Sequence, residues 1–337
     1  MACLIAGPVP EDAMLRRSLA CRFAPALFAA LLCAPPAATA DEALRVGNLV
    51  PTSFSFLPLQ VGIERGIFKK HGLDVSKIDF PRGAASGHQA LAAGSVDMVA
   101  GGGVEMGFIV KGSPELAVAV ITERPNSVTL TVRSDDSIKT IADLKGRPVG
   151  ISTTGGLSNW LVREISRRQG WGPDGIQAVA IGAMSAQVAA LKTKQIDAGV
   201  IDLATGFQLE ELGEGRILVK FGDIIEAFVN QASYASTDIL KRRPGAVRRF
   251  LAGWFDAVAW VRANRAETIA IGVRELNISP AVAAKSYDGV LPGYSRDGRF
   301  HPAAIRTLAR SMVETGMLAS EPDMSKLYTE DYLPPLR

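Results

Sequence analysis

The chain has 337 residues, of which 21% are charged, and its formal net charge is +3. A balance this close to neutral argues against nucleic acid as a partner, because proteins that bind its phosphates concentrate basic residues. The three cysteines, Cys3, Cys21 and Cys33, all lie in the first forty residues, so the chain from Asp41 onward can form no disulfide and has no thiolate nucleophile.

The first forty residues predict a secretory signal peptide. Met14–Arg17 begins a positively charged region, Phe23–Cys33 is an apolar run too short to span a bilayer, and Ala38–Ala40 is a small-residue cleavage site. We therefore assign residues 1–40 to the signal peptide and expect cleavage after Ala40. The residues before Met14 resemble an over-called start, so Met14 rather than Met1 is the expected initiator. The remaining chain is long enough for two lobes with large cores.

Strands and helices are predicted to alternate in the first part of that chain. The expected strands are Leu44–Val50, Ile78–Phe80 and Val96–Ala100, and the expected helices are Leu57–Arg65 and Gln89–Ala93. A small-residue loop, Gly83–Gly87, precedes the second helix, and Gly101–Gly103 follows the third strand. This alternation is typical of βαβ units in a parallel sheet.

The same pattern recurs 100 residues later. Ala90-Leu91 and Val96-Asp97 match Ala190-Leu191 and Ile196-Asp197, and both copies place a strand and a small-residue loop before the helix. Two such units indicate two α/β lobes of one design. Loops at the carboxyl ends of their parallel strands would then face a shared crevice.

Two segments are expected to cross between the lobes. The first joins strands Val118–Thr122 and Val128–Val132, and the second is Asn230–Thr237. Residues 41–127 are thus predicted as lobe 1 and residues 128–232 as lobe 2 with hinge crossings at both ends. Residues 233–337 would return to lobe 1 and add C-terminal helices, of which the last is expected at Pro302–Glu314.

The stretch Arg147–Gly170 carries the clearest candidate for a binding site. A short strand ending at Ser152 is followed by the loop Thr153–Gly156, and an amphipathic helix begins at Leu157. Such a loop offers unpaired backbone N–H groups, two hydroxyls and the positive end of a helix dipole, so it could hold an anion. The alternative is that the two threonines only cap the helix.

Five fragments in this order resemble one known family over nearly all of the chain after Ala40. They are LPLQVGIERGIFKKHGLDV, LAAGSVDMVAGGG, IADLKGRPVGISTTGG, VAALKTKQIDAGVID and GMLASEPDMSKLYTEDYL. The order is similar to that of periplasmic solute-binding proteins for nitrate, taurine and aliphatic sulfonates, whose fold the thiamine-precursor-binding proteins share. The resemblance implies a type II periplasmic binding protein fold, with two doubly wound α/β lobes on a two-strand hinge.

The resemblance also implies a function: lobe closure over a small solute, which is delivered to the permease of an ABC importer. An anionic solute is expected, of the sulfonate, taurine, nitrate, bicarbonate or carboxylate type; a thiamine-precursor pyrimidine or another heterocycle is the alternative. We expect a periplasmic monomer with no cofactor. The residues implied to line the pocket are Thr52, Ser53, Phe54, Gly83, Ala84, Ala85, Ser86, Gly102, Gly103, Thr153, Thr154, Gly155, Gly156, Met184, Ser185 and Asp202.

Charged residues near the implied pocket leave the solute open. Glu105 and Asp202 would disfavour an anion, whereas Arg82 and Arg124 could offset them. Pairing at the surface is the simpler explanation for all four. His88 follows the second small-residue loop and could contact the solute.

Other function classes lack the residues that they need. The histidines His71, His88 and His301 stand in no metal-binding spacing, and no nucleophile with a base can be assembled, so neither a metal site nor catalysis is expected. A same-fold enzyme of menaquinone or thiamine-precursor synthesis is the strongest rival, but the signal peptide and the missing cysteine-rich iron signature oppose it. A sensor module would need a membrane helix or a signalling domain, and we expect neither.

Overall fold

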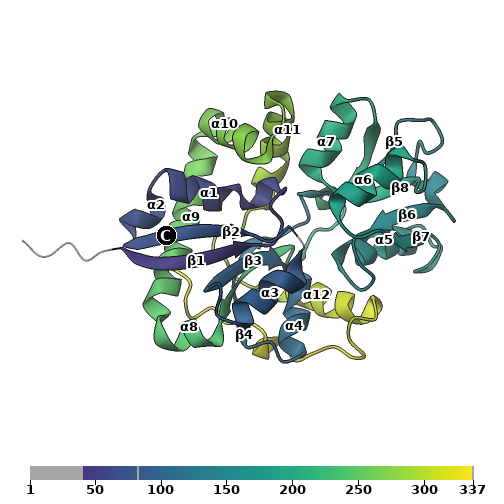
Figure 1. Cartoon of the computed structure of the whole chain (residues 1–337). Helices are drawn as coiled ribbons and strands as arrows, with labels where there is room; N and C mark the ends of the chain where they lie inside the picture. Colours follow the sequence, from purple (N-terminus) through teal and green to yellow (C-terminus); the bar gives the residue numbers. More distant parts are fainter. Residues whose placement is uncertain (1–40, 82, 336–337) are drawn as a thin grey trace, which may run out of the picture. The chain divides into compact units, whose positions relative to one another are not determined.

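The computed structural model describes residues 41–81 and 83–335, so the predicted signal peptide and Arg82 lie outside the described residues. Residues Asp41–Arg337 form one compact unit. Its strands make two five-stranded sheets, which we call sheet A and sheet B (Figure 1). In the part of the chain that is described, no helix is long and apolar enough to cross a membrane.

The two sheets have the same topology. Sheet A has the order β2 (Leu73–Asp79), β1 (Glu42–Asn48), β3 (Met98–Gly102), β10 (Gln231–Ser236) and β4 (Glu115–Thr122). Sheet B has the order β7 (Gln177–Ala180), β6 (Pro148–Ile151), β8 (Ala198–Asp202), β5 (Val128–Arg133) and β9 (Gly215–Lys220). In each sheet the first three strands are parallel and the fourth runs antiparallel to both of its neighbours.

The helices follow the strands in the order that the sequence predicts. They are α1 (Leu57–Glu64), α2 (Ile67–Lys70), α3 (Ala84–Ala92), α4 (Met106–Val110), α5 (Leu157–Arg168), α6 (Met184–Lys192), α7 (Leu203–Glu211), α8 (Thr237–Arg242), α9 (Pro244–Ala263), α10 (Arg265–Leu276), α11 (Pro280–Val290) and α12 (Pro302–Glu314). Short 3-10 turns lie at η1 (Phe54–Phe56), η2 (Gly103–Glu105), η3 (Ile141–Leu144), η4 (Phe221–Asp223), η5 (Leu291–Gly293) and η6 (Met324–Lys326). The final helix has the predicted bounds.

The prediction for α3 was wrong at its start, because the helix begins at Ala84 and not at Gln89. Gly83, with φ +86°, precedes it as the N-cap, and Ala84 and Ala85 are strong helix formers. Gly87 looks like a loop residue in the sequence. Its missing side chain instead makes room for Leu49, whose Cδ2 atom would lie 2.0 Å from an added Cβ.

The sequence repeat corresponds to a repeated turn at the start of β3 and of β8. Backbone N–H groups of Ser95 and Gln195 donate to the carbonyls of Ala90 and Ala190 at 2.8 and 2.9 Å. The carboxylate of Asp97 then binds Arg45 on β1, at 3.1 Å. Asp197 in the same way lies 2.6 Å from an Arg133 nitrogen on β5. Each aspartate thus ties its turn to a strand of its own sheet, which confirms the two-unit design.

The chain passes from sheet A to sheet B between β4 and β5, and returns between β9 and β10. These two segments are held together, since the Phe228 and Asn230 N–H groups donate to the carbonyls of Glu123 and Thr122. A buried side-chain network reinforces them: the Asn230 amide donates to the Thr122 hydroxyl, which donates to Gln231, both at 3.0 Å.

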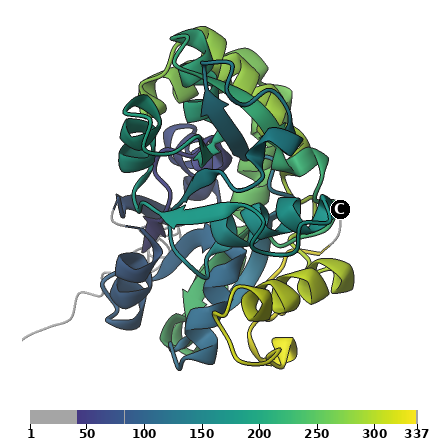
Figure 2. The same cartoon turned by 90° about the vertical axis from the view of Figure 1, so that its right-hand side faces the viewer.

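The cores explain where the C-terminal helices lie. One core joins sheet A to α1, α9 and α11, and contains the buried apolar face of α9, where the Phe250 ring stacks on Phe68 with 5.3 Å between centroids. A second core combines residues of both sheets with α5 and α12. Helix α12 contacts η2 and also α5, and Figure 2 shows it in yellow beside the chain that follows β3.

A buried charge cluster supports the end of β3. His88 on α3 forms hydrogen bonds with Glu115 at 2.9 Å and with Glu105 at 2.8 Å, and the side chains of His88 and Glu115 are almost fully buried. Gly101 is required here because an added Cβ would lie 2.1 Å from a Glu105 oxygen. The expected surface pairing of Glu105 is thus wrong: its partner is a buried histidine.

This cluster changes the protonation of His88. Burial alone lowers the pKa of the imidazole, but the hydrogen bonds and negative charges of Glu105 and Glu115 outweigh burial and raise it to about 9. His88 is therefore a cation at neutral pH, held between two carboxylates.

We predict that this cluster makes stability depend on alkaline pH. Because the pKa of His88 is about 9 in the folded chain and 6.5 without these contacts, its contribution is complete below pH 6.5 and is lost as the pH rises through 9. Urea unfolding at pH 6.5, 8 and 9.5 should show a decline. In Glu105→Gln, which removes one of the two charges, the folded-state pKa of His88 should be lower, so the decline should be smaller and end at a lower pH. A wild-type free energy of unfolding that stays constant to pH 9.5 would contradict this assignment.

Candidate functional site

The residues proposed for the pocket all lie where a parallel strand ends and a helix or 3-10 turn begins. Thr52–Phe54 follow β1, Gly83–Ser86 begin α3 after β2, and Gly102 and Gly103 join β3 to η2. Thr153–Gly156 join β6 to α5, Met184 and Ser185 begin α6 after β7, and Asp202 ends β8. Since parallel strands present their carboxyl ends at one edge, the loops of each sheet gather at a single edge.

Two of these loops, one from each sheet, meet directly. The side chains of Ser53 and Asp202 are both buried, and the Ser53 hydroxyl lies close enough to the Asp202 carboxyl group to lower its pKa. Asp202 also caps α7, since its Oδ1 atom accepts from the Ala204 N–H at 3.0 Å. Burial raises the pKa of Asp202 to about 7 in spite of these contacts. Asp202 is therefore about half ionised at pH 7 and mostly neutral below about pH 6.

The Thr/Gly loop after β6 leaves its hydroxyls available. Thr153 and Thr154 are exposed, and neither caps α5, whose N-cap is Gly156 without a side-chain hydrogen bond. The capping alternative for the threonines is therefore wrong. In the described chain no hydrogen bond uses the N–H of Thr153 or Thr154.

The glycines of that loop have protein partners. The Gly155 N–H donates to the Asn159 side chain at 3.2 Å, and its carbonyl accepts from the Thr315 hydroxyl at 3.0 Å. The expectation that the whole loop has free N–H groups is thus wrong at Gly155. The N–H groups still open to a ligand are those of the two threonines and of the first turn of α5.

The end of α12 connects this loop to sheet A. Met317 packs against two glycines. A Cβ added to Gly107 would lie 2.6 Å from the Met317 sulfur, and a Cβ added to Gly155 would lie 3.8 Å from the Met317 Cβ. Farther along α5, the Trp160 indole donates to the Glu314 carboxylate at 2.7 Å. These contacts bring the loop after β3 and the loop after β6 to the same region.

Several proposed residues are already committed to packing. The Phe54 side chain is 1% exposed and belongs to the core of sheet A, while its carbonyl accepts from the Tyr294 hydroxyl at 3.1 Å. The carbonyls of Gly102 and Gly103 accept from the Tyr234 hydroxyl at 2.6 and 3.2 Å. Phe54 can thus offer a ligand little beyond its backbone N–H, and the Gly103 N–H already donates to the Asn230 carbonyl at 3.0 Å.

Arg124 is the charged residue whose environment most suggests a ligand. It lies half-buried in the first segment between the sheets, directly after Glu123. Within the described ranges its guanidinium forms no hydrogen bond and no ion pair, unlike the predicted surface pairing. A half-buried guanidinium that has no protein partner is a favourable position for an anionic ligand.

Sequence reasoning missed Tyr234, Thr315 and Met317, which shape the loops after β3 and β6. They lie far along the chain from the loops that they contact, and no local pattern connects them. A cavity of about 330 Å³ lies elsewhere, at the amino end of β3. Two arginines line it, Arg45 and Arg242, and both are paired with aspartates, so we assign it no ligand.

Comparison with known proteins agrees with this geometry. A protein of Brucella abortus, named as a candidate binding protein, is 29% identical over 325 residues, which cover 91% of this chain and 97% of that protein. The aliphatic sulphonate-binding protein SsuA of Escherichia coli has a TM-score of 0.73 at 21% identity and covers 86% and 92% of the two chains. The nitrate-binding protein NrtA of Synechocystis PCC 6803 has a TM-score of 0.69 at 16% identity, with 86% of both chains covered.

These similarities show the periplasmic binding protein fold, which the sequence predicted. The family model described as NMT1/THI5 like matches residues 53–268, which is more than half of the chain. The chain therefore belongs to the NMT1/THI5-like family.

Proposed function

We propose that this protein is the exported solute-binding component of an ABC importer and that it captures a small anion between two lobes. The observation that carries the proposal is the meeting of loops from both sheets, seen where the buried Ser53 side chain approaches the buried Asp202 carboxyl group. The fold neighbours are periplasmic binding proteins for a sulphonate and for nitrate, which supports the same class of solute and the same compartment. In this proposal the protein acts as a monomer that docks on a membrane permease.

The proposed mechanism is closure of the lobes. Lobe 1 would comprise residues 41–127 and 233–337, lobe 2 residues 128–232, and the two crossings would act as the hinge. A solute that contacts both lobes binds the closed state more tightly than the open state, so it shifts the population toward closure. The permease would then recognise the closed form.

An anion is favoured by the groups that the structure leaves without partners. The exposed hydroxyls of Thr153 and Thr154 stand before the N-terminus of α5, where the helix dipole favours negative charge. Arg124 adds a cation. Asp202 repels an anion less than the sequence suggested. Because its pKa is about 7, a large fraction of its carboxyl groups is protonated and neutral near pH 7.

The proposal is tested by a thermal-shift screen of the purified protein, followed by calorimetry. The screen should contain nitrate, bicarbonate, taurine, alkanesulfonates, short carboxylates and, as the neutral class, pyrimidines. A solute at 100 times its dissociation constant stabilises the folded state by about 2.7 kcal/mol, which gives a clear shift in melting temperature. A shift with pyrimidines alone would replace the anion by a heterocycle, and no shift with any compound would contradict solute capture.

We predict that Thr153→Val/Thr154→Val weakens binding of the solute found in the screen by tenfold or more. The change keeps the side-chain shape but removes two hydroxyls, and a hydrogen bond to a charged group contributes about 1.5–3 kcal/mol. Calorimetry measures the loss, and the melting curve without solute is the control. Because neither threonine caps α5, that curve should change little. A lower melting temperature with unchanged affinity would move the site to the loops after β1 and β2.

We also predict that Arg124→Gln lowers the affinity for an anion by about tenfold to a hundredfold, in line with the loss of a charged hydrogen bond. Arg306→Gln is the matched control, since Arg306 is exposed and, within the described residues, has no hydrogen bond or ion pair. The Arg306→Gln variant should bind the anion with the affinity of the wild type. Affinity should also become less sensitive to salt in Arg124→Gln. Equal affinities in both variants would remove Arg124 from the site.

A further inference from the structure

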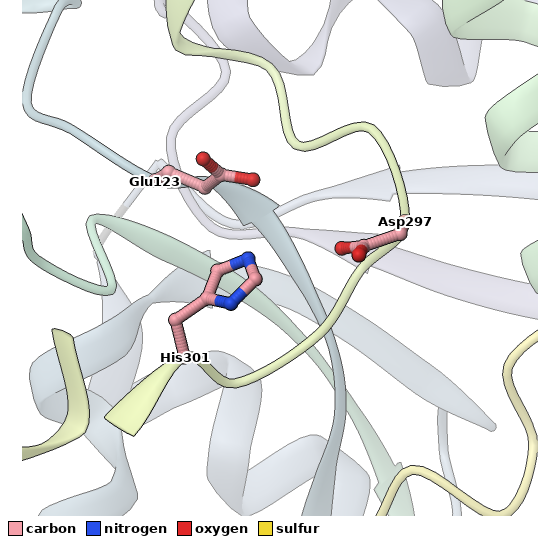
Figure 3. A group of neighbouring side chains, drawn as sticks. All are labelled: Glu123, Asp297 and His301. Atoms are coloured by element: carbon pink, nitrogen blue, oxygen red, sulfur yellow. The ribbon is translucent and has the colours of Figure 1, made fainter. Parts of the chain in front are cut away.

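We propose that Glu123, Asp297 and His301 form a binding site for a divalent transition-metal cation. Figure 3 shows the two carboxylates pointing toward one another, with the imidazole ring reaching into the space between them. One ligand atom from each residue lies within 4.8 Å of the ligand atoms of the other two. The three residues are brought together only by the fold, because Glu123 directly follows β4 whereas Asp297 and His301 precede α12.

The ligand set suits a metal of the zinc class. One imidazole nitrogen and two carboxylate oxygens are ligands that Zn²⁺, Mn²⁺, Ni²⁺ and Fe²⁺ accept, and the two carboxylates balance the charge of the ion. Three protein ligands leave at least one coordination position for water or for a second ligand.

The backbone holds two of the ligands in place. The Glu123 N–H donates to the Gly293 carbonyl at 2.9 Å, and the Glu123 carbonyl accepts from the Phe228 N–H at 3.1 Å. The Oδ1 atom of Asp297 accepts a hydrogen bond from the Arg299 backbone N–H at 2.9 Å. Its Oδ2 atom lies 4.0 Å from the Arg299 side-chain Nε, at the limit of an ion pair. Arg299 itself pairs more closely with Glu330, at 2.6 Å. Asp297 therefore keeps one carboxylate oxygen available.

His301 differs from the other two histidines. His71 and His88 are each bound to carboxylates, at 2.8 Å from Asp256 and from Glu105. His301 is exposed and precedes α12 as its N-cap, without a side-chain capping bond. Among the residues that the structure describes, neither its ring nor the Glu123 carboxylate has a hydrogen bond or an ion pair. Two of the three ligands are thus free to bind a metal without breaking a contact.

A bound cation would connect distant parts of the chain. Glu123 lies in the first crossing between the sheets, and its backbone also contacts the second crossing through Phe228. Asp297 and His301 lead into α12, which contacts α5 beside sheet B. The metal would therefore link the crossings to the C-terminal helix. This site uses none of the sixteen residues proposed for the solute pocket.

The test is titration of the chelator-treated, purified protein with Zn²⁺ alone, with no solute present. Calorimetry should give one site per chain, and the melting temperature should rise with zinc. Glu123→Gln and His301→Ala should each weaken binding by tenfold or more, and the double variant should abolish it. Glu321→Gln is the control, since Glu321 is exposed and, among the described residues, unpaired. Melting curves in chelator establish that each variant is folded.

The outcomes separate this site from solute capture. Absence of one-to-one zinc binding to the wild type, or equal zinc affinity in all variants, would overturn the metal site and leave the solute proposal unaffected. Solute binding is measured in chelator, so its failure there would not weaken a positive zinc result. Weakened binding of Mn²⁺ or Ni²⁺ in the same variants would extend the site to those metals.

Discussion

The structure depends on the place where the chain crosses twice between its sheets. A buried hydrogen-bond network lies there, formed by Thr122, Asn230 and Gln231. Removing one partner would leave another buried polar group without a hydrogen bond, which destabilises the folded state. The network holds β4 and β10 as neighbours at the point where β4 ends and β10 begins. It therefore determines how the carboxyl-end loops of the two sheets are presented to each other.

Contacts on two sides support those loops. On one side Asp202 joins Ser53 and begins α7, whose Leu203 fills the space beside Gly289 of α11. On the other side Thr315 binds the loop after β6, and Met317 lies between that loop and Gly107 of α4. Among the described residues, the groups of the loop after β6 that remain without partners are the threonine hydroxyls and the N–H groups at the start of α5. Such groups bind polar ligands without needing to be charged themselves.

Periodicity and turn residues predicted the fold well because they act locally. The alternation of strands and helices, the repeat around Asp97 and Asp197, and the bounds of the final helix, Pro302–Glu314, each depend on a few neighbouring residues. The order of the βαβ units then follows from rules that hold for parallel sheets. The start of α3 was missed because glycine and serine usually indicate a loop, and only tertiary packing of Leu49 shows why Gly87 belongs in a helix.

The site was less predictable because its chemistry depends on pairs far apart in sequence. His88 looked like a solute contact, but Glu115 makes it part of the interior. Arg124 and Glu105 looked equivalent as surface charges, and the structure pairs only Glu105. Glu123, Asp297 and His301 match no spacing motif, since the chain travels through sheet B between the first and the others.

The position of β10 has a consequence for the order in which the protein can fold. All strands of sheet B lie between Val128 and Lys220, so this sheet can form from one uninterrupted segment. Sheet A cannot form in this way, because β10 lies between β3 and β4, and β4 can pair only after β10 has been synthesised. A chain that emerges with its N-terminus first must therefore hold β1, β2 and β3 with an unpaired edge until sheet B has been made. During that interval β3 presents open backbone groups to other chains, which makes the first-synthesised half the last to be protected from aggregation.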